Sequence, residues 1–293
     1  MNEKLFKIFV DGVYCYGLLP YAPAQWRLIE RLHKWEPSPP SRHVVRRNGC
    51  SWSIDLSYGH IDREIFYKGR FESETTLWLQ SHVKRGWCCL DVGANIGYYT
   101  VLLSSLAGDT GRVIAFEPSI RFWPRLTENL RLNAVSNVTA EKVALSNDRS
   151  VKTVHASKTT ASLFRRKNVE EVGALEDIAC TPLDDYLVTH PLPGLDFIKL
   201  DIDGFEPFFI EGALKTLSRY RPLIVMEVHP RILREGGGDA ITMMTRLADL
   251  GYAFHSMDGA ASYADAGAVF KALDPTGHGG VNLVCRPQSG SQS

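Results

Sequence analysis

From residue 87 onward, short apolar runs alternate with amphipathic stretches. Strands of a parallel sheet are buried on both faces, so they read as near-continuous apolar runs joined by helical crossovers. The alternation therefore predicts an α/β fold with a doubly wound, seven-stranded, mostly parallel sheet, whose antiparallel last strand closes a terminal hairpin. The predicted strands are Cys88–Val92, Arg112–Glu117, Val138–Leu145, Leu195–Ile202, Pro222–Val228, Tyr252–Met257 and Val281–Cys285, and the predicted helices are Tyr98–Ala107, Ile120–Leu132, Pro207–Ser218 and Ala240–Leu250.

The chain before residue 87 divides into two parts. Residues 1–40 end in a proline-rich stretch that breaks any helix, and we expect an N-terminal extension that serves as a lid or a dimer arm. Residues 41–86 combine a hairpin centred on Asn48-Gly49, a dipeptide typical of two-residue hairpin turns, with a helix at Ser73–Val83. Residues 87–287 then form the ligand-binding core, followed by a tail at residues 288–293.

The stretch from Trp87 to Thr100 carries the strongest chemical signal, because it reads as a strand, a glycine turn and a helix start. Gly93 and Gly97 suit positions with positive φ or close approach to a ligand, above the first amides of the helix. Asn95 replaces the glycine that lets a pyrophosphate approach in dinucleotide sites. Asp91 adds negative charge that suits a cationic sulfonium or amino group. The pattern favours S-adenosylmethionine over NAD.

Two later strand ends extend this site. Glu117 closes the second strand and, in a doubly wound sheet, lies across from the glycine turn, where an acidic residue accepts hydrogen bonds from both ribose hydroxyls. Pro118 fixes the turn that follows. Ala144, Leu145 and Ser146 end the third strand, where their backbone and small side chains can face an adenine.

Four ordered motifs resemble the FkbM family of S-adenosylmethionine-dependent methyltransferases: Leu90–Thr100, Ala115–Pro118, Val143–Ser146 and Phe197–Glu206. The resemblance covers about residues 60–230. It implies a class I methyltransferase fold, which is Rossmann-like, and methyl transfer to a hydroxyl of a small natural product or sugar. The family usually carries glutamate where this chain has Asp203. The predicted cofactor-binding residues are Glu72, placed by the resemblance near the methionine moiety, with Asp91, Gly93, Ala94, Asn95, Gly97, Thr100, Glu117, Pro118, Ala144 and Asp201.

Candidate catalytic groups follow the fourth and fifth strands. Asp201 ends the fourth strand with Lys199 on the same face, and Glu227 and His229 share a face at the end of the fifth. The set can act as a base that removes the acceptor proton. Alternatively, Asp201, Glu227 and His229 hold a divalent metal that lowers the pKa of the acceptor hydroxyl. A purely structural interpretation gives Lys199 an ion pair and His229 a role in the turn.

Three further stretches are candidates for covering the site. His155–Lys167 is polar, β-prone and basic, and it is either a mobile loop over the site or a solvated face. Arg234–Asp239 and Asp258–Gly280 lie beside the strand ends where substrates enter, which makes them lid candidates by position.

Composition narrows the possible partners. The 33 Lys and Arg residues balance the 33 Asp and Glu residues, so bulk charge suggests no nucleic-acid partner. No apolar run approaches the length of a membrane span, and the start does not read as a signal peptide, so we expect a cytoplasmic protein without a membrane partner. The six cysteines show no CxxC pair and are expected to be reduced. Two alternative functions stay open: an NAD-dependent oxidoreductase and a non-catalytic cofactor-binding scaffold. Whether the protein forms homo-oligomers also stays open.

Overall fold

The computed structural model describes residues 42–56, 59–157, 160–167, 170–173, 175–263, 265, 267–269 and 280–288. The predicted N-terminal extension at residues 1–40, the tail beyond residue 288 and much of the lid candidate at 258–280 lie outside the described residues.

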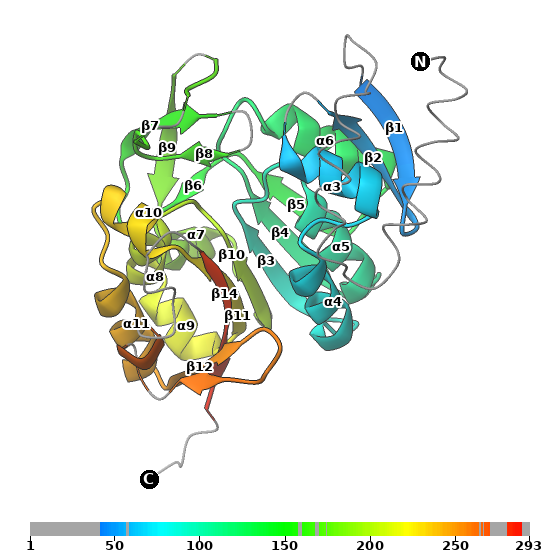
Figure 1. The fold of residues 1–293 in the computed structure, drawn as a ribbon. Helices are drawn as coiled ribbons and strands as arrows, with labels where there is room; N and C mark the ends of the chain where they lie inside the picture. The colour runs from blue at the N-terminus through cyan, green and yellow to red at the C-terminus, as the bar shows by residue number, and fades with distance from the viewer. Residues whose placement is uncertain are drawn as a thin grey trace.

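Figure 1 shows a central twisted sheet with helices on both faces. Within the described residues this sheet has eight strands in the order β13-β12-β14-β11-β10-β3-β4-β5. All neighbouring pairs from β11 to β5 are parallel, whereas β14 runs antiparallel between β11 and β12. The doubly wound sheet with an antiparallel last strand is therefore confirmed, and a short strand, β13, is added at its edge. The strands are β3 (Cys88–Val92), β4 (Arg112–Phe116), β5 (Val138–Glu141), β10 (Phe197–Leu200), β11 (Leu223–Val228), β12 (Tyr252–Ser256), β13 (Ser262–Tyr263) and β14 (Val281–Pro287).

Side chains of the central sheet alternate between two apolar cores. In β3, Leu90 and Val92 face one core and Cys89 faces the other, as period-two alternation requires. Helices α7, α8, α9 and α11 contribute to the first core, and α3, α4 and α5 contribute to the second. The helices are α3 (His60–Lys68), α4 (Ser73–His82), α5 (Tyr98–Ala107), α6 (Trp123–Leu132), α7 (Leu183–Thr189), α8 (Glu206–Gly212), α9 (Leu214–Tyr220), α10 (Pro230–Glu235) and α11 (Ala240–Asp249).

A second, four-stranded sheet beside the carboxyl ends of the central strands was not predicted (Figure 1). Its order is β6 (Ala144–Leu145), β9 (Glu176–Thr181), β7 (Val151–Ala156) and β8 (Ala161–Ser162). The predicted strand Val138–Leu145 was wrong in its extent, because its last residues leave β5 and pair with β9 instead. Because residues 138–145 are β-prone throughout, the sequence does not show where the chain passes from one sheet to the other. The predicted helix Pro207–Ser218 is likewise two helices, broken at Ala213, whose backbone is not helical.

The predicted N-terminal hairpin is confirmed as β1 (Arg42–Arg47) and β2 (Cys50–Asp55). Its turn has positive φ at both Asn48 and Gly49, as two-residue hairpins require. The hairpin is attached to α6 through polar side chains, since Asn129 and Asn133 accept hydrogen bonds from backbone amides of β2 at 2.8 Å. These bonds fix the hairpin beside the first βα unit of the sheet.

Two features of the described residues concern the membrane and the state of the cysteines. Among the helices of the described residues, none has the length and apolar character that a bilayer crossing demands. The five cysteines in the described part of the chain carry free thiols, and four of them are buried.

A buried ion pair between Asp62 on α3 and Arg125 on α6 generates a stability prediction. Asp62 also accepts the backbone N–H of Asp55, so both partners are built into the packing. Removing one partner leaves a buried charge uncompensated, and Arg125→Met should lower the free energy of unfolding by about 3–5 kcal/mol in urea titrations. Arg131→Met removes a solvent-exposed pair on the same helix and should leave the urea midpoint unchanged. Equal effects of the two variants would contradict the prediction.

Candidate active site

The glycine turn after β3 is pressed against the end of β10. Gly93 has φ +89°, and a Cβ at this position would lie 1.9 Å from the carbonyl oxygen of Asp201. The amides of Gly93 and Ala94 both donate to the carbonyl of Phe116 at 3.0 Å, which ties the turn to β4 as well. Gly97 precedes α5 with φ +86°, and a Cβ there would meet the side chain of Leu126 at 2.6 Å. Both glycines are thus required by the packing of the protein itself.

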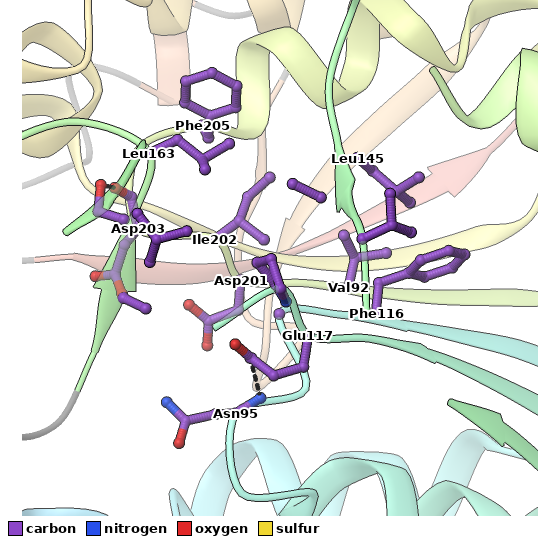
Figure 2. A pocket seen from close by; sticks show the side chains of 17 residues that line it. Val92, Asn95, Phe116, Glu117, Leu145, Leu163, Asp201, Ile202, Asp203 and Phe205 are labelled. Atoms are coloured by element: carbon purple, nitrogen blue, oxygen red, sulfur yellow. Dashed lines mark hydrogen bonds between the residues drawn. The ribbon is translucent and has the colours of Figure 1, made fainter. Parts of the chain in front are cut away.

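Glu117 follows β4 and faces the glycine turn (Figure 2). One of its carboxylate oxygens accepts the amide of Asn95 at 2.7 Å, and the other accepts the amide of Ser119 at 2.9 Å. Burial raises the pKa of Glu117 to about 7, although these two backbone donors favour its ionised form. Because a carboxylate offers about four lone-pair positions, each oxygen retains one for a ligand.

A cavity enclosing about 570 Å³ of empty space, part of it open to solvent, lies above Glu117. This volume lies in the range of small-molecule sites. Its walls come from the glycine turn, from the end of β4, from the turn after β10, and from β6, β7 and β8 of the second sheet. Among the described residues that line it are three carboxylates and no lysine, arginine or histidine. The lining residues are Val92, Gly93, Asn95, Phe116, Glu117, Pro118, Val143, Ala144, Leu145, Val154, Ala161, Ser162, Leu163, Asp201, Ile202, Asp203 and Phe205.

The predicted cofactor-binding residues divide into two groups. Gly93, Asn95, Glu117, Pro118, Ala144 and Asp201 line the cavity. Glu72, Asp91, Ala94, Gly97 and Thr100 are absent from that lining. In this second group Thr100 donates a hydrogen bond from its hydroxyl to Asp91, which links α5 to β3 behind the turn. Burial raises the pKa of Asp91 to about 6, and the bond from Thr100 opposes that rise.

Lys199 is fully buried among carboxylates on the sheet face covered by α4 and α5. Its ammonium group lies 3.1 Å from a carboxylate oxygen of Asp201 and 5.1 Å from the ring centre of Tyr99. Burial lowers the pKa of Lys199, but the negative charges around it outweigh burial and raise the pKa overall. The ion pair expected for Lys199 is therefore present, and it fixes one oxygen of Asp201, whose side chain is 28 % exposed.

A row of polar side chains runs across the central sheet on this face, and we call it the polar row: Lys199, Asp201, Glu227 and Asn282. Leu200 pairs with Met226 in the parallel register, which places Asp201 and Glu227 next to one another at the strand ends. Glu227 in turn pairs with Asn282 of β14. Burial first, and then the negative charge of Asp201, raise the pKa of Glu227 to about 9. Asp201 is the member of this row that reaches the cavity.

Asn282 is a residue that the sequence analysis missed. Its side-chain amide donates to Thr75 at 3.2 Å and to Glu72 at 3.5 Å, and Glu72 also accepts the hydroxyl of Tyr99 at 2.7 Å. The carbonyl oxygen of the Asn282 side chain is buried and has no partner among the described residues. The strand pattern predicted β14, but the register that sets Asn282 opposite Glu227 has no signal in the sequence.

The predicted metal site finds no support in the geometry. Among the described residues, which include Asp201, Glu227 and His229, no three His, Cys, Asp or Glu side chains converge on a position for a metal ion. His229 precedes α10 without a side-chain capping bond, and burial lowers its pKa. Its Nδ1 atom is buried and has no partner within the described part of the chain.

The turn after β10 is held by its own acidic residue. Glu206 accepts the amides of Ile202 at 2.9 Å and Gly204 at 3.0 Å, and burial raises its pKa to about 8. Asp203 and Gly204 both take positive φ in this turn. Glu206 thus stabilises the local fold, whereas Asp201 and Asp203 face the cavity.

Comparison with family models decides the affiliation of the chain. The model described as the methyltransferase FkbM domain matches residues 91–254, which is more than half of the sequence. The chain belongs to the FkbM methyltransferase family. A search of curated proteins found no match to it.

A search of solved structures returned methyltransferases at low sequence identity. An FkbM methyltransferase from Methylobacillus flagellatus KT is 17% identical, with 68% of this chain and 43% of that chain covered and a TM-score of 0.41. A putative methyltransferase from Streptococcus mutans, solved in complex with SAH, is 10% identical over 74% of this chain and 97% of that chain, with a TM-score of 0.45. Fibrillarin from Aeropyrum pernix is 13% identical over 84% and 82% of the two chains, with a TM-score of 0.42.

The burial of Glu117 leads to a prediction about the pH dependence of stability. The folded protein ionises this carboxyl near pH 7, and the unfolded chain does so near 4.5. Between these values the folded state binds the extra proton, so the free energy of unfolding falls as pH rises. Glu117→Gln stays neutral in both states, and from about pH 4 to about pH 8 it should gain up to about 3 kcal/mol of stability relative to the wild type.

Urea unfolding at several pH values measures this difference. Glu74→Gln alters an exposed carboxylate and should follow the wild-type profile. Parallel profiles for Glu117→Gln and the wild type would contradict the raised pKa of Glu117 in the folded protein.

Proposed function

We propose that this methyltransferase uses S-adenosylmethionine to methylate a hydroxyl group of a small natural product or sugar. The observation that carries the proposal is the acidic cavity at the carboxyl ends of β3 and β4, where Glu117 keeps accepting capacity and no basic side chain is among the described lining residues. A cofactor with a sulfonium, an ammonium and no phosphate is complementary to this charge.

The cavity residues fit such a nucleoside. Glu117 has one free lone-pair position on each oxygen for the two ribose hydroxyls. Ala144 and Leu145 provide an apolar wall for the adenine. When bound, S-adenosylmethionine supplies a methyl group activated by its sulfonium. Glu72, which receives hydrogen bonds from Tyr99 and Asn282, is proposed to lie near the methionine moiety.

Asp201 is the proposed proton acceptor. It lines the cavity, and its Oδ2 is held by Lys199 at 3.1 Å. Lys199 thereby orients the carboxylate, which is left with a second oxygen to hydrogen-bond an acceptor hydroxyl and take its proton during an in-line displacement. Glu227 and His229 are proposed to shape the acceptor side of the same strand ends.

An NAD-dependent oxidoreductase is the main alternative from another class. It shares the strand, turn and helix and the acidic residue that binds ribose. Its diphosphate would meet the carboxylates of Glu117, Asp201 and Asp203 in a cavity without a basic residue among the described lining. Asn95 also occupies the position of the glycine that admits a pyrophosphate.

Calorimetry with S-adenosylhomocysteine and with NADH tests the choice of cofactor. We expect S-adenosylhomocysteine to bind and NADH to give no measurable heat. Binding of NADH together with no binding of S-adenosylhomocysteine would overturn the proposal.

Asp201→Asn tests the chemistry separately from the binding. The amide keeps the size of the side chain but cannot take a proton, so methyl transfer should fall by about 10²-fold or more while S-adenosylhomocysteine still binds. Transfer is measured by incubating the protein with labelled cofactor and an extract of its producing cells, followed by mass spectrometry. Asp109→Asn, an exposed aspartate, serves as the control. Unchanged transfer in Asp201→Asn would remove Asp201 from the mechanism, and cofactor binding without any transfer in the wild type would favour a non-catalytic scaffold.

A further inference from the structure

One wall of the cavity comes from outside the central sheet. Residues 160–167, here called the cover segment, comprise β8 and the chain that follows it. Ala161, Ser162 and Leu163 of this segment line the cavity that Glu117 also lines. The segment belongs to the stretch that was either a loop over the site or a solvated face, and the lining residues favour the first interpretation.

Backbone pairing joins the start of the cover segment to the second sheet through a short hairpin. His155 of β7 pairs with Ser162, and Ala156 pairs with Ala161, which makes β8 two residues long. β8 is the last strand in the order of the second sheet. So short an edge strand contributes little stability of its own, and contacts with the rest of the protein must fix its position.

A mostly buried ion pair joins the cover segment to the turn after β10. The guanidinium of Arg166 donates to the carboxylate of Asp203 at 2.9 Å, and the two side chains are only 16 % and 18 % exposed. Asp203 lies in the turn after β10, two residues beyond Asp201. The hydroxyl of Ser162 reaches the backbone carbonyl of the same aspartate at 3.5 Å. The cover segment is thus fastened to the turn that carries the proposed base.

Two weaker contacts continue this attachment toward α10. The amide of Lys167 donates to the carboxylate of Glu235 at 3.3 Å. The ring of Phe164 rests on Gly236, where a Cβ would approach it to 2.8 Å. Unlike Asp203, none of Phe164, Lys167, Glu235 and Gly236 belongs to the cavity lining, so both contacts lie outside it.

We propose that Arg166 and Asp203 are positioning residues that hold the cover segment over the cofactor cavity. The inference rests on the proposed function, because it takes the occupant of the cavity to be S-adenosylmethionine or its demethylated product. Opening of the Arg166–Asp203 pair would free the cover segment and ease the exit of a ligand bound between Glu117 and that segment. The pair therefore sets the residence time of the product and the exclusion of water around the reacting methyl group.

The dissociation rate of S-adenosylhomocysteine tests this role in the full-length protein. Loss of a charge-assisted hydrogen bond in Asp203→Asn or Arg166→Ala should speed dissociation at least about tenfold in stopped-flow displacement. Asp203→Glu keeps the charge and should restore much of the wild-type rate. Arg165→Ala is the matched control, because the neighbouring Arg165 is 79 % exposed and pairs with Glu171 outside the cavity lining.

The possible outcomes separate the two proposals. No binding of S-adenosylhomocysteine to the wild type would overturn the proposed function and this inference with it. Binding with the same dissociation rate in the wild type, Asp203→Asn and Arg166→Ala would overturn the inference alone. Equal acceleration in Arg165→Ala would also overturn it, since general loss of positive charge would then be the cause.

Limited trypsin digestion gives a second test that needs no variant. The cover segment contains consecutive cleavage sites at Arg165, Arg166 and Lys167, and a protease cuts a folded segment only when it opens. Saturating S-adenosylhomocysteine should slow cleavage of wild-type protein at these three sites more than at sites elsewhere. Equal cleavage with and without the bound compound would overturn the inference even if the variants fail to fold.

Discussion

The close contact between the turn after β3 and the backbone at the end of β10 is the constraint on which the site depends. Without a Cβ at Gly93, the carbonyl of Asp201 can lie against the turn, and two amides of the turn can bind the end of β4. Three strand ends are thereby drawn to one place. Glu117, Asp201 and the cavity between them owe their relative positions to this packing.

The meeting of the ends of β3, β4, β10 and β11 also places several carboxylic acid side chains close together. Burial and mutual repulsion raise the pKa of Asp91, Glu117, Asp203 and Glu227, because each ionised carboxylate is poorly solvated and lies near others of the same sign. Lys199 is a buried cation on the sheet face covered by α4 and α5, and it is paired with Asp201. A positive charge placed among these carboxylates would favour their ionised forms, which is the electrostatic basis of the proposed cationic cofactor.

The sequence was sufficient for what depends on local pattern. The first βα unit, with α5 at Tyr98–Ala107, and the hairpin at Asn48-Gly49 were predicted because periodicity and turn chemistry are encoded within a few residues. Six of the predicted cofactor residues line the cavity, and Gly93, Asn95 and Glu117 among them were found from the strand and turn pattern around the first βα unit. What could not be predicted depends on pairing between distant segments. The division of Val138–Leu145 between two sheets and the pairing of Arg166 with Asp203 are examples of this limit.

The position of β14 links the site to the order in which the chain emerges during synthesis. This strand comes last among the described elements, yet it lies between β11 and β12 and sets Asn282 opposite Glu227. Until it inserts, β11 and β12 have unpaired backbone groups at their facing edges, and the polar row is incomplete. A nascent chain that has already formed the glycine turn and the cavity around Glu117 still lacks Asn282, the member of the polar row that β14 contributes. The row is therefore complete only after β14 has paired with β11, a contact between strands that lie far apart in the sequence.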